Sequence, residues 1–113
     1  MPRNTARALL AAAPTFAALG DPTRLRVVAR LSEQGPLSIT KLTEGSDITR
    51  QGLTKHLQVL EDAELVASTR RGRENVYELQ RRRLADAQRW LDVISAEWDG
   101  TLARLKTFVE TDS

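Results

Sequence analysis

The fold is decided by residues 38–63, SITKLTEGSDITRQGLTKHLQVLEDA, in which a short helical segment, a turn and a longer helical segment follow one another. Ser38 is a good N-cap for a short helix over residues 39–44, and the Gly-Ser-Asp at 45–47 is typical of a turn. Thr49 can cap a second helix that continues to the end of the stretch. The stretch therefore predicts a helix-turn-helix.

The second of these helices has two unlike faces. Its apolar stripe repeats at i, i+4 and i+7 and consists of Leu53, Leu57 and Leu60. At about 100° per residue, the opposite side carries polar groups without a carboxylate, namely Gln51, Lys55 and Gln58, with Thr54 beside them. A helix fits the major groove of DNA, where such side chains read base edges. The polar face therefore predicts a DNA-reading helix.

A basic hairpin is predicted directly after this helix. Residues 65–69 and 74–79 have the pattern of strands, and the Arg-Arg-Gly-Arg at 70–73 joins them. Gly72 supplies the positive φ that a tight hairpin needs. Arginines on such a hairpin can contact phosphates or the minor groove. The order of these features predicts a winged helix-turn-helix, mainly α with a small β-hairpin, whose wing covers about residues 65–80.

Two helices are expected before this motif. Residues 5–19 are rich in Ala and Leu, which favours a helix with a kink or a restart at Pro14. Asp21 and Pro22 are suited to start the next helix, which is expected to end near Gln34 because a Gly-Pro pair follows. The apolar face of that second helix is expected to contain Leu25, Val28, Ala29 and Leu31.

A long helix is expected over about residues 82–110, weakened by Gly100, with Arg81–Arg83 as a hinge and helix start. Its apolar side chains recur every three or four residues, and so small a domain cannot cover all of them. We therefore predict a homodimer built from the first and last helices. The predicted interface residues are Leu9, Phe16, Leu84, Leu91, Ile94, Trp98, Leu102 and Leu105. Two-fold pairing predicts a palindromic operator with half-sites about 10 base pairs apart, or a multiple of that.

Composition and charge narrow the function classes. The 113 residues suit one domain, residues 1–113, and the net charge of +2 is unevenly spread. Residues 49–83 carry eight Lys/Arg against five Asp/Glu, whereas residues 84–113 carry three against six. With no cysteine and one histidine, disulfides and thiolate metal sites are excluded, and no catalytic constellation is found. We expect no enzyme activity, no metal and no cofactor.

No stretch of the sequence approaches the length of apolar residues needed to span a membrane, so we expect no membrane association and a cytoplasmic location. The basic middle segment favours an anionic partner. Double-stranded DNA is the anionic partner that fits the predicted reading helix and the basic hairpin.

The sequence resembles the arsenical-repressor, or ArsR, family of winged-helix regulators over roughly residues 16–98. The resemblance is carried by FAALGDPTRLR at 16–26, LTKHLQVL at 53–60, AELV at 63–66 and RGRENVYEL at 71–79. It implies a homodimer that represses transcription by occupying a promoter, with the first and last helices at the dimer interface.

Departures from the family pattern concern metal sensing and one turn. Metal-sensing members carry two cysteines on the helix matched here by residues 38–44, where this chain has Ser38, Thr40 and Lys41. Other members use Asp and His on the last helix, whereas the histidine here is His56. The resemblance therefore carries over no metal site, and a small-molecule or protein effector stays open. Glu64 stands where the family usually has Gly, which predicts a strained turn into the wing.

The predicted DNA contacts come from the reading helix and the wing. They are Thr49, Arg50, Gln51, Thr54, Lys55, His56, Gln58, Arg70, Arg71 and Arg73. The unpaired N–H groups at the helix start are also suited to a phosphate. Three alternatives remain. The polar face of the reading helix and the arginines of the wing could simply face solvent, and His56 could be a packed residue. A winged helix could also bind proteins instead of DNA. A protein-binding surface would be acidic or apolar, and DNA binding would weaken steeply with salt.

Overall fold

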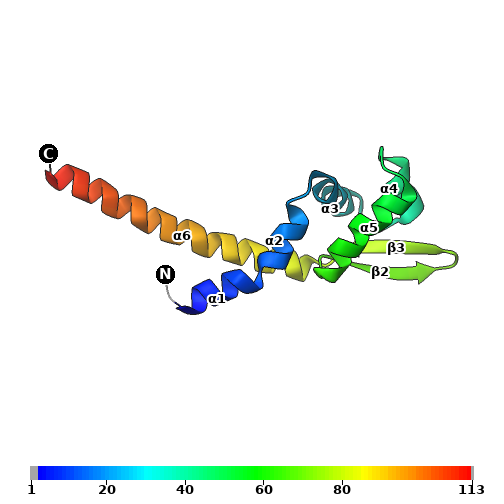
Figure 1. The fold of residues 1–113 in the computed structure, drawn as a ribbon, viewed down its shortest axis with the longest axis horizontal. Helices are drawn as coiled ribbons and strands as arrows, with labels where there is room; N and C mark the ends of the chain where they lie inside the picture. The colour runs from blue at the N-terminus through cyan, green and yellow to red at the C-terminus, as the bar shows by residue number, and fades with distance from the viewer. Residues whose placement is uncertain (1–2, 113) are drawn as a thin grey trace.

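The computed structural model describes residues 3–112, and within them the chain forms a winged helix-turn-helix (Figure 1). The helices are α1 (Arg3–Ala11), α2 (Ala13–Leu19), α3 (Pro22–Gln34), α4 (Ile39–Glu44), α5 (Arg50–Asp62) and α6 (Arg81–Asp112). The strands are β1 (Leu37–Ser38), β2 (Val66–Arg71) and β3 (Glu74–Leu79). Helices α4 and α5 are the helix-turn-helix, and the β2–β3 hairpin is the wing.

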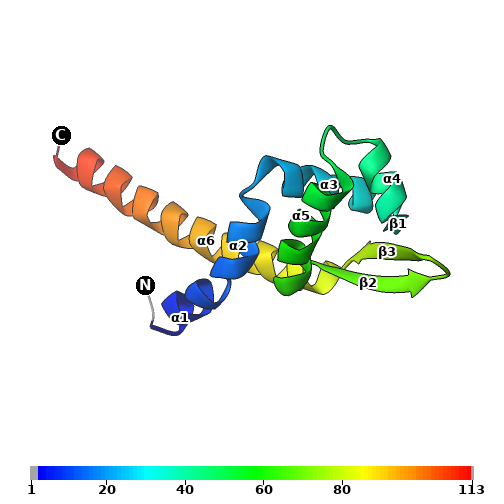
Figure 2. The ribbon, with the colours of Figure 1, turned by 45° about the vertical axis from the view of Figure 1, so that its right-hand side comes forward.

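Helix α6 makes the molecule elongated. Its 32 residues span about 48 Å at a rise of about 1.5 Å per residue, and the molecule measures 68 × 28 × 21 Å. It passes through Gly100 without a break. In Figures 1 and 2, α1 and α2 lie against the N-terminal half of α6, and its C-terminal half extends beyond the other described elements. The wing projects at the opposite end of the molecule.

Local capping rules account for the helix starts. The side chains of Asp21, Ser38 and Thr49 each accept a hydrogen bond from the backbone N–H three residues later, at 3.0, 3.2 and 3.0 Å. These three predicted caps are confirmed. The predicted interruption near Pro14 is also confirmed, because α1 ends and α2 restarts so that this proline lies in the first turn, where its missing N–H costs nothing.

The core lies between α3, α4, α5 and the sheet. Leu53, Leu57 and Leu60 of α5 are at most 1% exposed, which confirms the predicted apolar stripe. The buried residues around them are Ala18, Val27, Val28, Leu31, Ile39, Leu42, Leu65, Val66, Tyr77 and Leu79. Because this stripe is buried, the polar face of α5 is turned outward.

The predicted apolar face of α3 is wrong in part. Val28 and Leu31 are buried as expected, and Val27 is buried as well, but Leu25 is 52% exposed and Ala29 is exposed. At about 100° per residue, the buried residues share one arc of the helix and Leu25 lies outside it. The neighbours α5 and β3 set that arc, and hydrophobicity along one helix does not reveal where its neighbours lie.

The sheet has three antiparallel strands in the order β1-β3-β2. The sequence did not predict β1, because a strand of two residues has no periodicity; it pairs Leu37 with Tyr77 and Ser38 with Val76. The hairpin is also longer than predicted. Arg70 and Arg71 belong to β2 and pair with β3, so the loop is reduced to residues 72–73, and Gly72 has the expected positive φ of 63°.

Within residues 3–112, no helix combines the length and the apolar character that crossing a membrane requires.

The turn between α5 and the wing carries the strain that the sequence predicts. Glu64 has a φ of 61°, and its carboxylate forms an ion pair with Arg83 in the first turn of α6. A residue with a Cβ pays about 1 kcal/mol in this left-handed region, whereas glycine does not. We therefore expect Glu64→Gly to be more stable than Glu64→Ala by about 1 kcal/mol in urea unfolding. Both variants lose the same ion pair, so equal stabilities would show that the turn is not strained.

Candidate nucleic-acid interface

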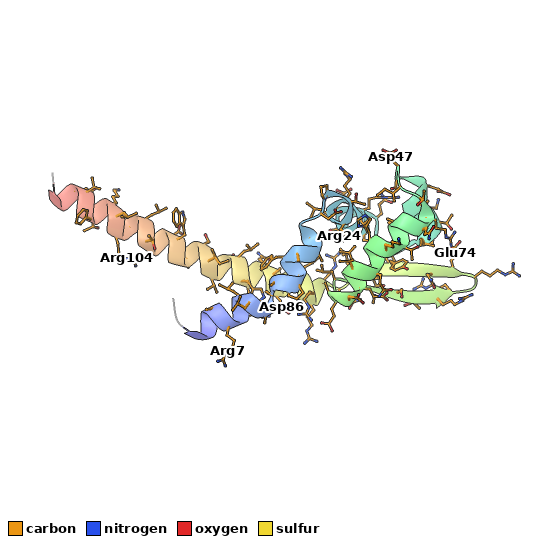
Figure 3. All side chains as sticks on the ribbon, in the orientation of Figure 1. Arg7, Arg24, Asp47, Glu74, Asp86 and Arg104 are labelled. Atoms are coloured by element: carbon orange, nitrogen blue, oxygen red, sulfur yellow. The ribbon has the colours of Figure 1, made fainter. Side chains whose placement is uncertain are left out.

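The outward face of α5 presents the polar side chains that the sequence predicts. Gln51, Thr54, Lys55 and Gln58 are all exposed. The Thr54 hydroxyl donates to the carbonyl of Arg50 at 2.8 Å, and the Gln58 amide donates to Asp62 at 2.8 Å. These two contacts stay within α5, so the surface of the helix remains open to a partner (Figure 3).

The start of α5 is tightly packed against the preceding turn. A Cβ on Gly52 would approach the Ile48 side chain to 2.9 Å and the Thr49 hydroxyl to 3.2 Å. A larger residue would therefore displace the turn, which explains a glycine inside the first turn of a helix. Thr49 and Arg50 are exposed at this end of α5, where the first backbone N–H groups have no partner within the helix.

His56 lies on the flank of α5 that faces α3. It is half-buried, and its Nδ1 is 3.3 Å from the Arg24 guanidinium and 3.8 Å from the Asp21 carboxylate. The backbone N–H of Arg24, together with the charges of Arg24 and His56, lowers the pKa of Asp21. The Arg24 guanidinium also donates to the Ala18 carbonyl at 2.8 Å. This cluster ties the reading helix to the junction of α2 and α3.

The wing places three guanidinium groups near its tip. Arg70 and Arg71 lie at the end of β2 and Arg73 lies in the turn, and all three side chains are exposed. The Arg70 Nε donates to the Gly72 carbonyl at 3.3 Å. In Figures 1 and 2 the hairpin projects past α5 on the side where α4 and the start of α5 lie. The wing arginines and the polar end of α5 therefore belong to one end of the molecule.

A polar cluster that the sequence did not reveal links the wing to the helix-turn-helix. The Thr40 hydroxyl of α4 donates to Oε1 of Glu74 at 2.6 Å, and Glu74 is the first residue of β3. The Arg50 guanidinium lies 4.0 Å from Oε2 of Glu74 and 3.5 Å from the Thr40 hydroxyl. These residues are far apart in sequence, so no local pattern indicates the Thr40–Glu74–Arg50 cluster.

Sequence comparison relates this frame to known regulators. Residues 19–69 match the family described as a helix-turn-helix domain. The HTH-type transcriptional regulator YuzN of Bacillus subtilis is 46% identical over 67 residues, which cover 54% of this chain and 73% of YuzN. The transcriptional repressor SdpR of the same organism is 30% identical over 76 residues, which cover 67% of this chain and 83% of SdpR.

The likeness extends to the three-dimensional structure. The ArsR-like transcriptional regulator from Rhodococcus sp. RHA1 is 36% identical and superposes with a TM-score of 0.75, covering 86% of this chain and 91% of that chain. The chain belongs to the ArsR family. It is therefore a DNA-binding transcriptional regulator, and a winged-helix module that binds only proteins is not favoured.

Metal-sensing ArsR members carry two cysteines in the segment that α4 matches. In this chain, the residues of that segment make other contacts. Ser38 caps α4, Thr40 donates to Glu74, and Lys41 is exposed and lies 3.9 Å from Glu44. Among residues 3–112, no three His, Cys, Asp or Glu side chains are grouped so that they could hold a metal ion.

A stripe of exposed apolar side chains follows α6 from its N-terminal half to its C-terminal end. Leu91 and Trp98 are 54% and 59% exposed. The other exposed members of this α6 stripe are Ile94, Leu102, Leu105, Phe108 and Val109. Leu9, Phe16 and Leu84 are half-buried, and Leu84 also packs against the core of its own domain.

Proposed function

We propose that this ArsR-family regulator is a repressor that binds a palindromic operator as a homodimer. Helix α5 enters the major groove, and the wing follows the flanking backbone. The observation that carries this proposal is the pairing of two outward surfaces on one frame: the exposed polar face of α5 and the three wing arginines. Residues 84–113, which carry three Lys/Arg against six Asp/Glu, extend away from the wing toward the other end of the molecule (Figure 3).

The proposed contacts divide between base reading and backbone binding. Side chains on the outward face of α5 are assigned to base edges and nearby phosphates: Arg50, Gln51, Thr54, Lys55 and Gln58. Thr49 is assigned to a phosphate at the start of the helix. His56, which contacts Asp21 and Arg24, is assigned to holding α5 in place.

Footprinting tests the function directly. The purified protein is incubated with the DNA upstream of its own gene, and a protected imperfect palindrome is the expected result. Competition with random DNA is then repeated at rising salt, where affinity is expected to fall steeply because phosphate contacts release counterions. Absence of any protected site, with no loss of binding at higher salt, would contradict DNA recognition by these surfaces.

The wing arginines are expected to contribute affinity that is independent of sequence. Because Arg71 and Arg73 lie on an exposed hairpin, each is expected to contact one phosphate. Arg71→Ala or Arg73→Ala should weaken binding to operator and random DNA alike, and should make the salt dependence shallower by about one unit. Arg104→Ala on the far half of α6 is the control and should leave the slope unchanged. An unchanged slope for both wing variants would mean that these arginines face solvent and do not contact phosphates.

We also propose that no transition metal regulates this protein. The chain has no cysteine and one histidine, so a site would need mostly oxygen ligands and would bind such metals weakly. Zinc, copper and trivalent arsenic titrated into the complex with operator DNA are expected to leave the protein bound. Specific release at micromolar metal would contradict the proposal.

A non-enzymatic role in the cytoplasm, where promoter DNA is found in bacteria, completes the proposed function. The curated relatives are transcriptional regulators, and the geometry supports DNA binding without a catalytic step. An effector of small-molecule or protein type is compatible with this role.

A further inference from the structure

Glu74 is an acidic residue on a surface that is otherwise suited to an anion. It begins β3 beside the tip of the wing, where it pairs with Arg71 of β2. Its side chain turns toward α4 and the start of α5 (Figure 3). A carboxylate here repels a phosphate backbone, so its position requires an explanation other than direct binding of DNA.

The carboxylate of Glu74 is fixed in place. The hairpin holds its backbone, and the Thr40 hydroxyl donates to Oε1 at 2.6 Å. The other oxygen, Oε2, is buried and has no hydrogen-bond partner among the described residues. The Arg50 guanidinium is 4.0 Å away from it. A buried carboxylate oxygen is costly unless a charge compensates it, so Glu74 attracts the Arg50 guanidinium.

Arg50 is the residue that this attraction constrains. Its side chain is 58% exposed and stands at the first position of α5, the end that a reading helix points toward base edges. An unconstrained arginine there would move to the nearest phosphate, because phosphates attract it regardless of sequence. Reading a guanine instead needs a guanidinium held in one orientation.

We propose that Glu74 is a positioning residue that holds Arg50 for base reading and thereby sets the selectivity for operator over random DNA. The inference rests on the proposed placement of α5 in the major groove. Glu74 weakens non-specific binding because it keeps one cation away from the backbone. The Thr40 hydroxyl supports this role because it fixes the carboxylate.

Glu74→Gln tests the proposal, because it removes the charge and keeps an oxygen for Thr40. Affinity for random DNA should rise several-fold, and the salt dependence should steepen by about one unit as Arg50 gains a phosphate. The ratio of operator to random affinity should fall by about tenfold, the size of one base contact. Thr40→Val should lower the ratio in the same direction by less. Glu78→Gln, an exposed carboxylate on the same strand, is the matched control and should leave the ratio unchanged.

A double-mutant cycle separates positioning from simple repulsion. If Glu74 acts through Arg50, Glu74→Gln should leave the ratio unchanged when Arg50→Ala is already present. The same fall in that background, or an unchanged ratio in the single variant, would overturn the proposal. If α5 does not lie in the major groove, the result is different: Arg50→Ala and Lys55→Ala would then leave operator affinity unchanged. Thermal unfolding of each variant confirms that it is folded.

Discussion

Replacing Leu91 and Trp98 together by aspartate is expected to give a folded monomer whose operator affinity is reduced at least about 100-fold. Both side chains are more than half exposed on α6. Two linked subunits bind two half-sites with an avidity that a single subunit lacks, which accounts for the size of the loss.

The physical reason is the uncovered α6 stripe. Soluble monomers rarely expose a continuous apolar surface of this length, and a second copy related by a two-fold axis can cover it. Leu9 and Phe16, half-buried near the N-terminal half of α6, supply further apolar surface beside the stripe. Pairing of this kind would set the two α5 helices about 34–36 Å apart, which is one turn of DNA.

Sedimentation equilibrium measures the assembly, and a titration with one or two half-sites measures the affinity. Ala96→Asp adds a charge to α6 at an exposed position on the side opposite the stripe, so this control should remain dimeric. A double aspartate variant that still forms dimers would contradict the assignment of the interface. A wild-type monomer with full operator affinity would contradict the dimer itself.

Replacing Gln51, Thr54 and Lys55 together by alanine is expected to lower operator affinity by several kcal/mol, since each good base contact is worth about 1–3 kcal/mol. The fold should survive, because the three side chains are exposed on the face of α5 opposite the buried leucines. Affinity for random DNA should fall much less, because most of it comes from phosphate contacts.

Single variants of this set refine the test. Each alanine is expected to relax specificity at one operator position, which selection from a randomised half-site would detect. A matched triple, alanine at Ser32, Glu33 and Gln34, changes three exposed polar residues at the end of α3 and should leave operator affinity unaltered. Unchanged affinity after the α5 substitutions would mean that another surface reads the operator.

Features governed by local rules were predictable from the sequence. The caps at Asp21, Ser38 and Thr49 follow from side chains that reach their own backbone, and the leucine stripe of α5 follows from helical periodicity. The positive φ of Glu64 was expected from the family resemblance, because Glu64 stands where the family usually has Gly. The outward placement of the polar face then follows from the buried one.

Features governed by tertiary contacts were not predictable. Leu25 is apolar and was expected to be buried, but it is exposed because α5 and β3 determine which arc of α3 is buried. Strand β1 exists only because β3 pairs with it. In the candidate site, the exposed α5 and wing residues could be identified from spacing and charge. The Thr40–Glu74–Arg50 cluster could not, because it joins residues from three elements that meet only in the folded chain.

The projecting α6 affects how this protein behaves in a size measurement. The radius of gyration of the single chain is 19.0 Å, whereas a compact protein of this length has about 13 Å. By the same scaling, 19.0 Å belongs to a compact protein of about 290 residues, more than twice this chain. A lone subunit would therefore leave a gel-filtration column early and imitate a compact dimer, so only a shape-independent mass from light scattering or sedimentation equilibrium distinguishes the two.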